Sequence, residues 1–481
     1  MKHSTDFDLM VIGAGSAGLT AAYVALGLGK RVALVENERI GGECTFTGCV
    51  PSKTLLASAR AAAVTARLPE FGVRAEADIE LDTSGVFAHI GEVVSRIAAD
   101  HLPEEMEAEG IRVLLGDARF EDPNTLRVGE QTFTASRFIL ATGSRPRVPD
   151  VAGLAEAGYL DNQSIWDLDE VPDSIAILGG GVIAAEVGLA LARLGAAVTI
   201  VQSRDRILPR EDAELAERLT AVLVSEGITI ITNTRVKRVT RAGMLATLFD
   251  AEGAPIVSAR EVLVATGRAP NTDLGLEAAG VRYGERGIAV DQHMRTSARH
   301  IYAAGDVVGP YRFTHVAERQ AISATLSAVL PVGRAVRYDD LVWVIFTDPE
   351  LAHLGLTEEE ARARHGDEID VYRYEFAHQD RARAEVASAG IAKYIVGRDK
   401  RLLGAHILGE RAGEMIAEAV IVKQRGLPFS ALSSVMHAYP TFSDAVKRPA
   451  DRASIAELRR STLVRMAQRL TSGGPGGDIP V

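Results

Sequence analysis

The chain has 481 residues, of which 47% are apolar and 24% are charged, a composition typical of a globular protein with several domains. Its 53 Lys and Arg against 64 Asp and Glu give a net charge of −11, which argues against a general nucleic-acid or anionic-membrane binder. Only two cysteines occur, close together, which excludes the disulfide framework of a small secreted domain. The polar amino terminus lacks a signal-peptide pattern, so we expect a cytoplasmic protein with small-molecule or protein partners.

The first forty residues have the pattern of a dinucleotide-binding unit. The apolar run 9–12 leads into Gly13, Gly15 and Gly18, after which an Ala- and Leu-rich helix is expected. Glycine is needed here because a side chain would keep the backbone away from a pyrophosphate bound at the helix N-terminus. The next apolar strand ends at Glu36, an acid placed to bind ribose hydroxyls. The glycines also argue against a membrane span in this uncharged stretch.

The same pattern occurs a second time. Strand 174–178 leads into Gly179 and Gly181, with Ala184 in the third glycine position. Gln202 follows Gly179 by 23 positions, which is also the interval between the first glycine and the acid of the first copy. The sequence therefore predicts two dinucleotide sites in one chain.

Two Ala-Thr-Gly turns, at 141–143 and 265–267, each follow an apolar strand, and a third strand ends at Asp306. We expect the two turns where the chain passes between nucleotide-binding domains. After about residue 340, alternating apolar strands such as 390–396 and 401–408 predict a separate α+β domain.

Cys44 and Cys49 follow the first nucleotide motif directly. In an ideal helix, Cα atoms five residues apart are about 8–9 Å from each other, whereas a disulfide needs less than about 7 Å. A bridge would therefore require distorted backbone, with Gly48 as the expected point of distortion, and a distorted bridge is more easily reduced. The alternative is a pair of buried, inert cysteines.

Together these motifs resemble the FAD-dependent pyridine nucleotide–disulfide oxidoreductases, which include glutathione reductase, dihydrolipoamide dehydrogenase and mercuric reductase. The resemblance covers about residues 6–460 and includes Cys44-x4-Cys49-Val-Pro-Ser-Lys53 and Ala304-Gly-Asp306. It implies an α/β fold with two Rossmann-like dinucleotide-binding domains and a C-terminal α+β dimerisation domain, and a homodimer with one FAD and one NAD(P)H per subunit. The expected domains are FAD-binding, 1–150 and 270–340; NAD(P)-binding, 151–269; dimerisation, 341–465; and a flexible tail, 466–481.

The resemblance also implies roles for individual residues. Asp306 is expected to bind the ribityl chain of FAD, and Thr314 is expected near the flavin pyrimidine edge, where a helix N-terminus stabilises negative charge. The residues expected to bind FAD are Gly13, Gly15, Ser16, Ala17, Gly18, Glu36, Lys53, Ala118, Thr142, Gly143, Asp306 and Thr314. Those expected to bind NAD(P) are Gly179, Gly181, Glu186, Gln202, Arg204 and Gly267.

Electrons are expected to pass from the nicotinamide through the flavin to the disulfide, with Cys49 next to the flavin and Cys44 attacking the substrate. Lys53 and Glu186 resemble the family's ion pair beside flavin N5, where a cation balances charge that develops on the ring. No resident metal ion is expected.

One segment departs from the pattern of glutathione reductases and dihydrolipoamide dehydrogenases. Those proteins have a His directly before Pro-Thr, with an acid five residues later, and this chain has Tyr439 and Asp444 in those places. A phenol with an ordinary pKa of about 10 donates a proton but is a poor base at neutral pH. His437, two positions earlier, is an alternative proton carrier, and a structural role for it is equally open.

The tyrosine is instead similar to that of mercuric reductases, as are the stretches 379–382 and 390–393. Mercuric reductases normally take up Hg(II) through a C-terminal cysteine pair, but this chain has no cysteine after Cys49. Two thiolates still make a chemically reasonable site for a soft metal.

The choice of nucleotide depends on the end of the second nucleotide strand. Gln202 stands where NAD enzymes place an acid, and Arg204 and Arg206 follow it. Guanidinium groups pair with a 2′-phosphate, so NADPH is favoured over NADH. The alternative is that both arginines are surface charges.

The leading hypothesis is an NAD(P)H oxidoreductase that passes electrons through FAD and the Cys44–Cys49 disulfide to a disulfide or a thiol-bound metal, as in mercuric reductases. A second hypothesis is a dihydrolipoamide dehydrogenase, which Tyr439 and Gln202 weaken. A third is a low-turnover flavoprotein that serves as a redox sensor or assembly subunit.

Overall fold

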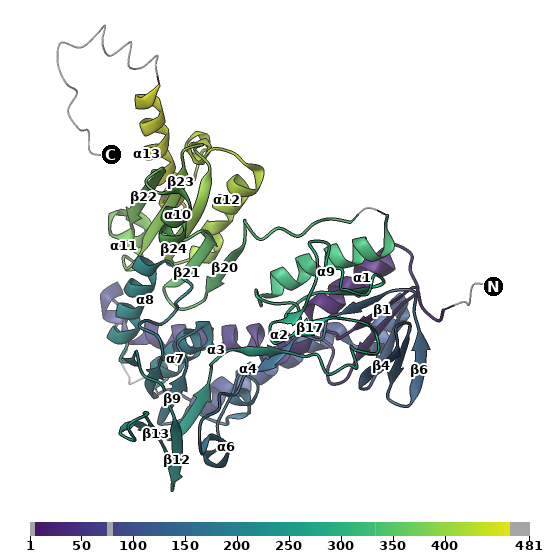
Figure 1. Cartoon of the computed structure of the whole chain (residues 1–481). Coiled ribbons are helices and arrows are strands. Elements are labelled where there is room, and N and C mark those ends of the chain that lie inside the picture. Colours follow the sequence, from purple (N-terminus) through teal and green to yellow (C-terminus); the bar gives the residue numbers. More distant parts are fainter. Residues whose placement is uncertain (1–4, 75–79, 332, 462–481) are drawn as a thin grey trace, which may run out of the picture. The chain divides into compact units, whose positions relative to one another are not determined.

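The computed structural model describes residues 5–74, 80–331 and 333–461, so the tail expected at 466–481 lies outside the described residues (Figure 1). Contacts between residues divide the chain into two compact units. The first unit comprises residues 1–59, 80–203 and 229–337, and the second comprises 60–79, 204–228 and 338–481.

The first unit contains a five-stranded parallel sheet in the order β19-β7-β1-β2-β3. Its strands are β1 (Leu9–Ile12), β2 (Val32–Glu36), β3 (Ile111–Leu115), β7 (Phe138–Leu140) and β19 (Ile301–Ala303). Helices α1 (Ser16–Gly27) and α9 (Thr314–Val329) pack against each other beside it. β1 is apolar and fully buried, as expected for a strand inside a parallel sheet covered on both faces. Because β19 pairs with β7, the sheet joins segments that are far apart in the chain.

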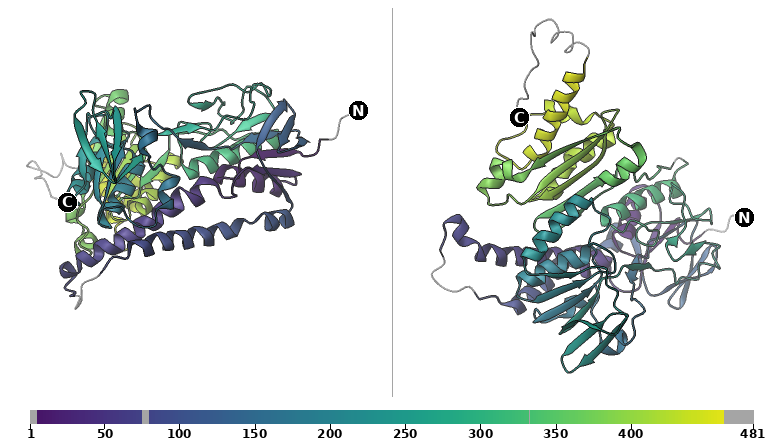
Figure 2. Two further views of the ribbon diagram at one scale, coloured as in Figure 1. Left: turned by 90° about the horizontal axis from the view of Figure 1, so that it is seen from below. Right: turned by 60° about the vertical axis from the view of Figure 1, so that its left-hand side comes forward.

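A second parallel sheet of the same unit has the order β11-β10-β9-β15. Its strands are β9 (Ser174–Leu178), β10 (Ala197–Val201), β11 (Thr229–Ile231) and β15 (Glu261–Val264), and α7 (Val182–Arg193) joins β9 to β10. An antiparallel sheet of β12 (Arg238–Ala242), β13 (Leu245–Phe249) and β14 (Pro255–Ala259) lies next to it (Figure 2). The two copies of the strand–glycine–helix pattern therefore form two separate sheets.

The two Ala-Thr-Gly turns lead into strands that pair with each other. β8 (Ser144–Pro146) and β16 (Arg268–Pro270) form an antiparallel ladder. Other elements of the first unit are α2 (Gly42–Phe46), α4 (Thr83–Ala98), α5 (Pro103–Glu109), β4 (Ala118–Asp122), β5 (Thr125–Val128), β6 (Gln131–Thr134), α6 (Leu154–Ala157), β17 (Tyr283–Gly284) and β18 (Gly287–Ile288). Helix α3 spans Cys49–Ala66.

The second unit contains an antiparallel sheet in the order β20-β21-β24-β23-β22. Its strands are β20 (Val342–Ile345), β21 (Glu350–Gly355), β22 (Ile369–Glu375), β23 (Ile391–Gly397) and β24 (Leu402–Gly409). Its helices are α8 (Ala213–Ser225), α10 (Glu358–His365), α11 (Asp380–Ala384), α12 (Ala412–Arg425) and α13 (Asp444–Arg460). Helices α12 and α13 contact each other and the sheet around a core that includes the stacked rings of Tyr394 and Phe429.

Residues 204–228, which we expected in the NAD(P)-binding domain, group with the C-terminal residues in the second unit. A buried lysine explains part of this grouping. Lys393 Nζ on β23 lies 2.9 Å from Asp212 and 3.0 Å from Glu214, which stand just before and within α8. It also lies 2.6 Å from Glu358 at the start of α10.

No helix among the described residues is long and apolar enough to cross a membrane. The uncharged stretch near the amino terminus instead forms β1, a glycine turn and α1.

Candidate active site: a dithiol between two dinucleotide cradles

The two cysteines lie on either side of a break between two helices. Cys44 belongs to α2, Cys49 begins α3, and the two residues before Cys49 belong to neither helix. A Cβ atom on Gly48 would lie 2.9 Å from the Glu43 carbonyl oxygen, so glycine permits the close approach of the two segments. Both cysteines are free thiols, and the structure therefore shows the dithiol form of the pair.

Thr314 contacts both sulfur atoms. Its hydroxyl donates to Cys44 Sγ at 3.3 Å and lies 3.6 Å from Cys49 Sγ. Thr314 is the first residue of α9, and the N-terminus of a helix favours nearby negative charge. The sequence predicted Thr314 near a flavin edge, and the structure adds its contact with the thiols.

The two thiols share one proton unequally. A hydrogen bond from Cys49 lowers the pKa of Cys44 to about 6, with a further contribution from Thr314. The same hydrogen bond, together with burial, raises the pKa of Cys49. At neutral pH the proton therefore stays on Cys49, and Cys44 is the thiolate. Since the thiolate is the nucleophilic form of cysteine, Cys44 is the better nucleophile of the two at neutral pH.

The pair Lys53 and Glu186 is formed. Lys53 Nζ lies 2.8 Å from Glu186 Oε2, and the Glu186 side chain is 5% exposed. Lys53 lies on α3 one turn after Cys49. Its positive charge lowers the pKa of Cys49, but the hydrogen bond with Cys44 and burial raise that pKa by more. The ion pair thus joins α3, which begins at Cys49, to α7, the helix that connects β9 and β10.

The first glycine motif forms a cradle closed by the first Ala-Thr-Gly turn. Gly13 has a φ of +99°, and a Cβ there would lie 2.4 Å from the Ala141 carbonyl oxygen. Gly15 precedes α1 and offers no side chain to cap it, which leaves the first amides of the helix available to an anion. Glu36 at the end of β2 accepts a hydrogen bond of 2.7 Å from the Ala14 amide. These features fit a dinucleotide such as FAD.

The second glycine motif repeats this geometry. Gly179 has a φ of +105°, and a Cβ there would lie 2.5 Å from the Ala265 carbonyl oxygen, the first residue of the second Ala-Thr-Gly turn. Gly181 precedes α7, which also has no side-chain cap. Gln202 directly follows β10 and is buried. Each turn therefore closes the glycine loop of its own cradle, which explains why the two signals occur together.

The remaining predicted binding residues lie at the ends of helices and strands and in the loops between them. Ser16 and Ala17 form the first turn of α1, Thr142 donates to the Asn271 carbonyl at 2.7 Å, Gly143 and Gly267 have φ values of +69° and +122°, and Ala118 begins β4. Asp306 accepts a 2.7 Å hydrogen bond from Ser144. Arg204 belongs to the second unit.

A polar network holds the residue before Cys44, and no sequence motif indicated it. Glu43 accepts hydrogen bonds from Asn162 and from Arg268, the residue after the second Ala-Thr-Gly turn. Arg268 Nε also donates to Ser144 Oγ at 2.7 Å, and Ser144 donates to Asp306. Burial raises the pKa of Glu43 against the opposing charge of Arg268.

In the second unit, Tyr439 is 63% exposed and donates a hydrogen bond to Asp380. That bond raises the pKa of Tyr439, so the phenol keeps its proton at neutral pH. Asp444, the expected acid, instead begins α13 and is buried. Asp380 was missed, although it lies within the stretch 379–382 that resembles mercuric reductases.

His437 is held inside its own unit. Its Nε2 lies 2.7 Å from Glu418 Oε2 and its Nδ1 lies 3.0 Å from the Val435 carbonyl oxygen. With both ring nitrogens engaged, the arrangement favours the structural role that the sequence left open.

Two dinucleotide cradles, a dithiol with one thiolate and a nearby Lys–Glu pair define a pyridine-nucleotide-dependent disulfide oxidoreductase. Residues 7–321 match the pyridine nucleotide-disulphide oxidoreductase family, and residues 341–450 match the dimerisation domain of that family. The chain belongs to this family of NAD(P)H-dependent flavoproteins, and its dimerisation domain indicates a homodimer.

Similar proteins include the mercuric reductase of Streptomyces lividans, 35% identical over 93% of this chain and 96% of the relative. The dihydrolipoyl dehydrogenase of Thermus scotoductus is 33% identical over 92% and 97%. Among solved structures, the HOCl-induced flavoprotein disulfide reductase RclA from Escherichia coli has a TM-score of 0.84 at 29% identity, covering 92% of this chain and 99% of RclA.

Proposed function

We propose that the enzyme uses NADPH to reduce a disulfide or a thiol-bound soft metal, with Cys44 as the attacking thiolate. The observation that carries this proposal is the contact of Thr314 with both sulfur atoms, at 3.3 Å from Cys44 Sγ and 3.6 Å from Cys49 Sγ; the lowered pKa of Cys44 agrees with it. The similarity to mercuric reductases supports the metal as one acceptor.

Bound FAD supplies a two-electron carrier between the nicotinamide and the disulfide. Two electrons break the Cys44–Cys49 bond and leave two sulfur anions, of which Cys49 takes up a proton. The Cys44 thiolate then attacks one sulfur of an acceptor disulfide, forms a mixed disulfide and releases one thiolate. After losing its proton, Cys49 attacks the Cys44 sulfur, which re-forms the internal disulfide and releases the second thiolate.

Tyr439 is assigned as the proton donor to the leaving thiolate. The family resemblance implies that this residue of one subunit serves the cysteines of the other subunit. Its exposed hydroxyl and the bond to Asp380 support a donor that is neutral at physiological pH. Lys53 and Glu186 are assigned to the flavin side of the dithiol, where the cation offsets developing negative charge.

Preference for NADPH over NADH is assigned to Gln202 and Arg204. Arg206 is a weaker candidate than the sequence suggested, because its guanidinium donates to the carbonyls of Pro209 and Glu211 at 3.2 and 3.3 Å. Arg204 forms no ion pair or side-chain hydrogen bond within the described residues, so its guanidinium is open to a 2′-phosphate.

The test is NADPH oxidation by the purified holoenzyme with Hg(II) in excess thiol, with lipoamide and with glutathione disulfide, and with Cys49→Ser as the control. Rapid turnover with Hg(II) or a disulfide that is lost in the control supports the proposal. Turnover with lipoamide alone, preferentially in the direction of NAD reduction, would instead establish a dihydrolipoamide dehydrogenase. Reduction of the flavin without turnover of any acceptor would favour a redox sensor.

A further inference from the structure

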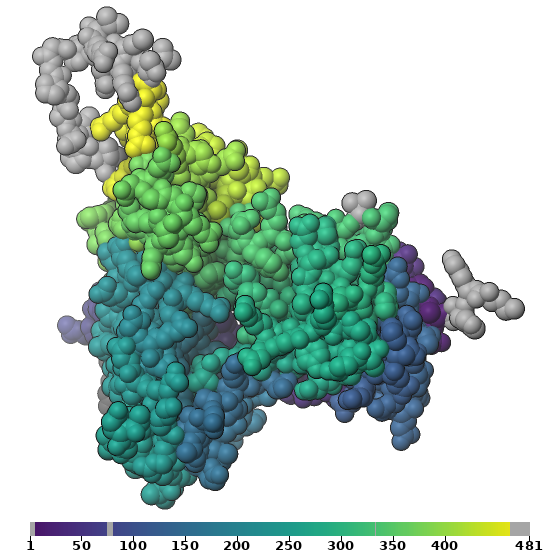
Figure 3. Space-filling view, viewed as in Figure 1, coloured from purple at the N-terminus to yellow at the C-terminus, as the bar shows by residue number. Residues whose placement is uncertain are grey.

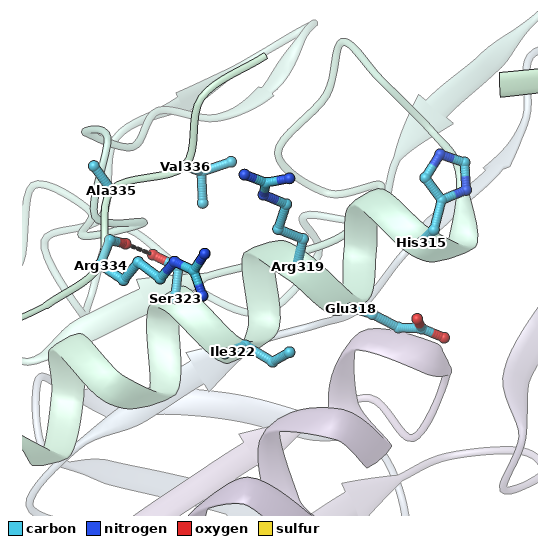
Figure 4. A pocket seen from close by; sticks show the side chains of 8 residues that line it. All are labelled: His315, Glu318, Arg319, Ile322, Ser323, Arg334, Ala335 and Val336. Carbon is cyan, nitrogen blue, oxygen red and sulfur yellow. Dashed lines mark hydrogen bonds between the residues drawn. The ribbon is translucent and has the colours of Figure 1, made fainter. Parts of the chain in front are cut away.

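A hollow of about 270 Å³ runs along α9 on the first unit, between this helix and the extended segment 334–336 (Figure 4). The space-filling view shows green residues of this part of the chain on the viewed face of that unit (Figure 3). The residues that line the hollow include His315, Glu318, Arg319, Ile322, Ser323 and Arg334.

The hollow has an excess of positive charge. Arg319 extends from α9 and Arg334 from the facing segment, and both point into the space between them, whereas Glu318 points away (Figure 4). Neither guanidinium forms an ion pair or hydrogen bond within the described part of the chain. Two guanidinium groups that face one hollow without a carboxylate partner among the described residues favour an anionic ligand there.

The facing segment is fixed against the helix. Ser323 donates its hydroxyl hydrogen bond to the Arg334 carbonyl oxygen, which holds the backbone of Arg334 beside α9. The side chain of Ile322 is 37% exposed and adds an apolar surface to the lining. The backbone segments that carry the two arginines are therefore held together, and the lining suits a ligand with a charged end and an apolar body.

The same helix begins at the redox pair. Thr314, its first residue, contacts both sulfur atoms, and His315 lies next in the chain and lines the hollow. At 1.5 Å per helical residue, Arg319 lies about 7 Å and Ser323 about 13 Å further along α9 than Thr314. A ligand whose sulfur meets Cys44 can therefore place an anionic group along this helix.

We propose that the hollow binds the anionic end of the acceptor. The inferred substrate class is a disulfide, or a metal held by thiols, whose thiol carries a carboxylate within reach of Arg319 and Arg334. This inference rests on the proposed function, because it places the reacting sulfur at Cys44. Arg319 and Arg334 then select among acceptors by charge, while the dithiol performs the chemistry.

The test compares two aromatic disulfides that differ in charge: dithiobis(nitrobenzoate), which carries two carboxylates, and dithiodipyridine, which is neutral. For the holoenzyme variant Arg319→Ala/Arg334→Ala we expect kcat/KM to fall at least tenfold with the charged disulfide and less than twofold with the neutral one. Arg282→Ala, which removes an exposed and unpaired arginine elsewhere on the same unit, is the matched control and should change neither value. Added salt should lower kcat/KM for the charged disulfide in the wild type.

Two further measurements separate this inference from the proposed function. The rate at which NADPH reduces the bound flavin should be the same in wild type and double variant, since no cofactor contact is removed. Binding of methylthio-nitrobenzoate, a carboxylate that cannot be reduced, is measured by calorimetry on the oxidised enzyme and should weaken at least tenfold in the double variant. If the wild type reduces neither disulfide, the proposed function fails, and this binding measurement alone decides the anion site. Equal losses with both disulfides, unchanged binding of the carboxylate, or a dimer that dissociates in the double variant would overturn the inference.

Discussion

The indole Nε1 of Trp166 donates a hydrogen bond to the Thr47 carbonyl oxygen at 2.9 Å. Thr47 lies between the two cysteines, in the break between α2 and α3. The same indole N–H lies 2.8 Å from the Asn162 carbonyl, and Asn162 in turn donates to Glu43. The loop between the cysteines is therefore held at both ends by residues more than a hundred positions away in the chain.

Replacing Trp166 by Phe keeps an aromatic ring and removes the hydrogen bond to the loop. We expect a loss of about 1 kcal/mol in the free energy of unfolding. We also expect acceptor turnover to fall several-fold, because the loop that sets the separation of the two sulfurs is no longer anchored. The rate at which NADPH reduces the flavin, measured by stopped-flow absorbance, should change less than twofold.

The chain's other tryptophan offers a matched control. Trp343, in the second unit, donates to Glu211 Oε1 at 2.8 Å. Trp343→Phe removes a hydrogen bond to a buried carboxylate and should cost at least as much stability, but should leave turnover at the wild-type rate. Equal effects of the two substitutions on turnover would show that Trp166 acts through general stability and not through the loop.

The pH dependence of Cys44 reactivity follows from its pKa of about 6. Its reaction with iodoacetamide in the reduced enzyme should rise with pH, with a midpoint near pH 6, because the thiolate is lost as the pH falls below that value. Cys49→Ala removes the hydrogen bond that lowers the pKa, so the midpoint should move toward the ordinary thiol value of about 8.5. At pH 7 the alkylation should be about two- to threefold slower in the variant, because the loss of thiolate is partly offset by the higher nucleophilicity of the more basic thiolate. An unchanged midpoint would assign the low pKa to another cause.

The Lys53–Glu186 pair is asymmetric in burial, since the lysine side chain is 36% exposed and the glutamate 5%. Lys53→Met leaves a buried carboxylate without its cation. We expect the free energy of unfolding to fall by about 1–3 kcal/mol. This is less than breaking a fully buried ion pair would cost, because solvent reaches the lysine. Lys53→Met/Glu186→Leu removes both charges and should recover part of the lost stability, as measured by the thermal unfolding midpoint. Flavin reduction by NADPH should be slow in both the single and the double variant, because each lacks the lysine cation. No recovery of stability would mean that the two residues do not act as a pair.

The glycine cradles could be predicted because their signals are local. Gly13 and Gly179 lie directly between an apolar strand and a helix, and each needs a conformation that glycine adopts readily. The break at Gly48 was predictable for a similar reason, since the spacing of the cysteines conflicts with one continuous helix. Strand alternation likewise indicated β23 and β24 of the second unit.

The partners of the redox loop could not be found in this way. Asn162 and Trp166 come from a stretch without a motif, and only the fold brings them to Glu43 and Thr47. Asp380 is a similar case, because its pairing with Tyr439 joins positions 59 residues apart. Local patterns identify backbone conformations, whereas side-chain pairs between distant segments depend on how the sheets are assembled.

The assignment of Tyr439 as a proton donor predicts a specific alkaline limit. The hydrogen bond to Asp380 raises the pKa of Tyr439, so the protonated donor persists to higher pH than an ordinary phenol. Asp380→Asn removes the carboxylate, and the alkaline limb of the kcat profile should move to lower pH. Tyr439→Phe should lower kcat and abolish that limb, and the profile is measured with a neutral disulfide. A Phe variant with the wild-type rate and profile would remove Tyr439 from the proposed mechanism.

Lys393 is expected to be the most important single cation for the stability of the second unit. Its side chain is 3% exposed and forms ion pairs with Asp212, Glu214 and Glu358. The Asp212 side chain is itself only 2% exposed. Burial alone would raise the pKa of Asp212, but the charges and hydrogen bonds of its neighbours, Lys393 among them, outweigh burial and lower it. Lys393→Met should therefore cost about 3–5 kcal/mol at pH 7, because it leaves buried charge uncompensated.

The sign of the pH effect separates charge from packing in this variant. A carboxyl group with a lowered pKa in the folded state contributes stability above its unfolded pKa of about 4, and that contribution is lost as the pH falls through the folded pKa. The deficit of Lys393→Met should be largest at neutral pH and shrink toward pH 4, as measured by urea midpoints at fixed protein concentration. Lys423→Met is the matched control, because the Lys423 ammonium donates to the carbonyls of Leu402 and Leu403 at 2.9 and 3.1 Å and its nearest carboxylate, Asp340, lies 3.9 Å away. The two carbonyls do not titrate and the ion pair is long, so its smaller deficit should depend on pH much less than that of Lys393→Met. A pH-independent deficit in Lys393→Met would show that the lysine acts by filling space and not by neutralising the three carboxylates.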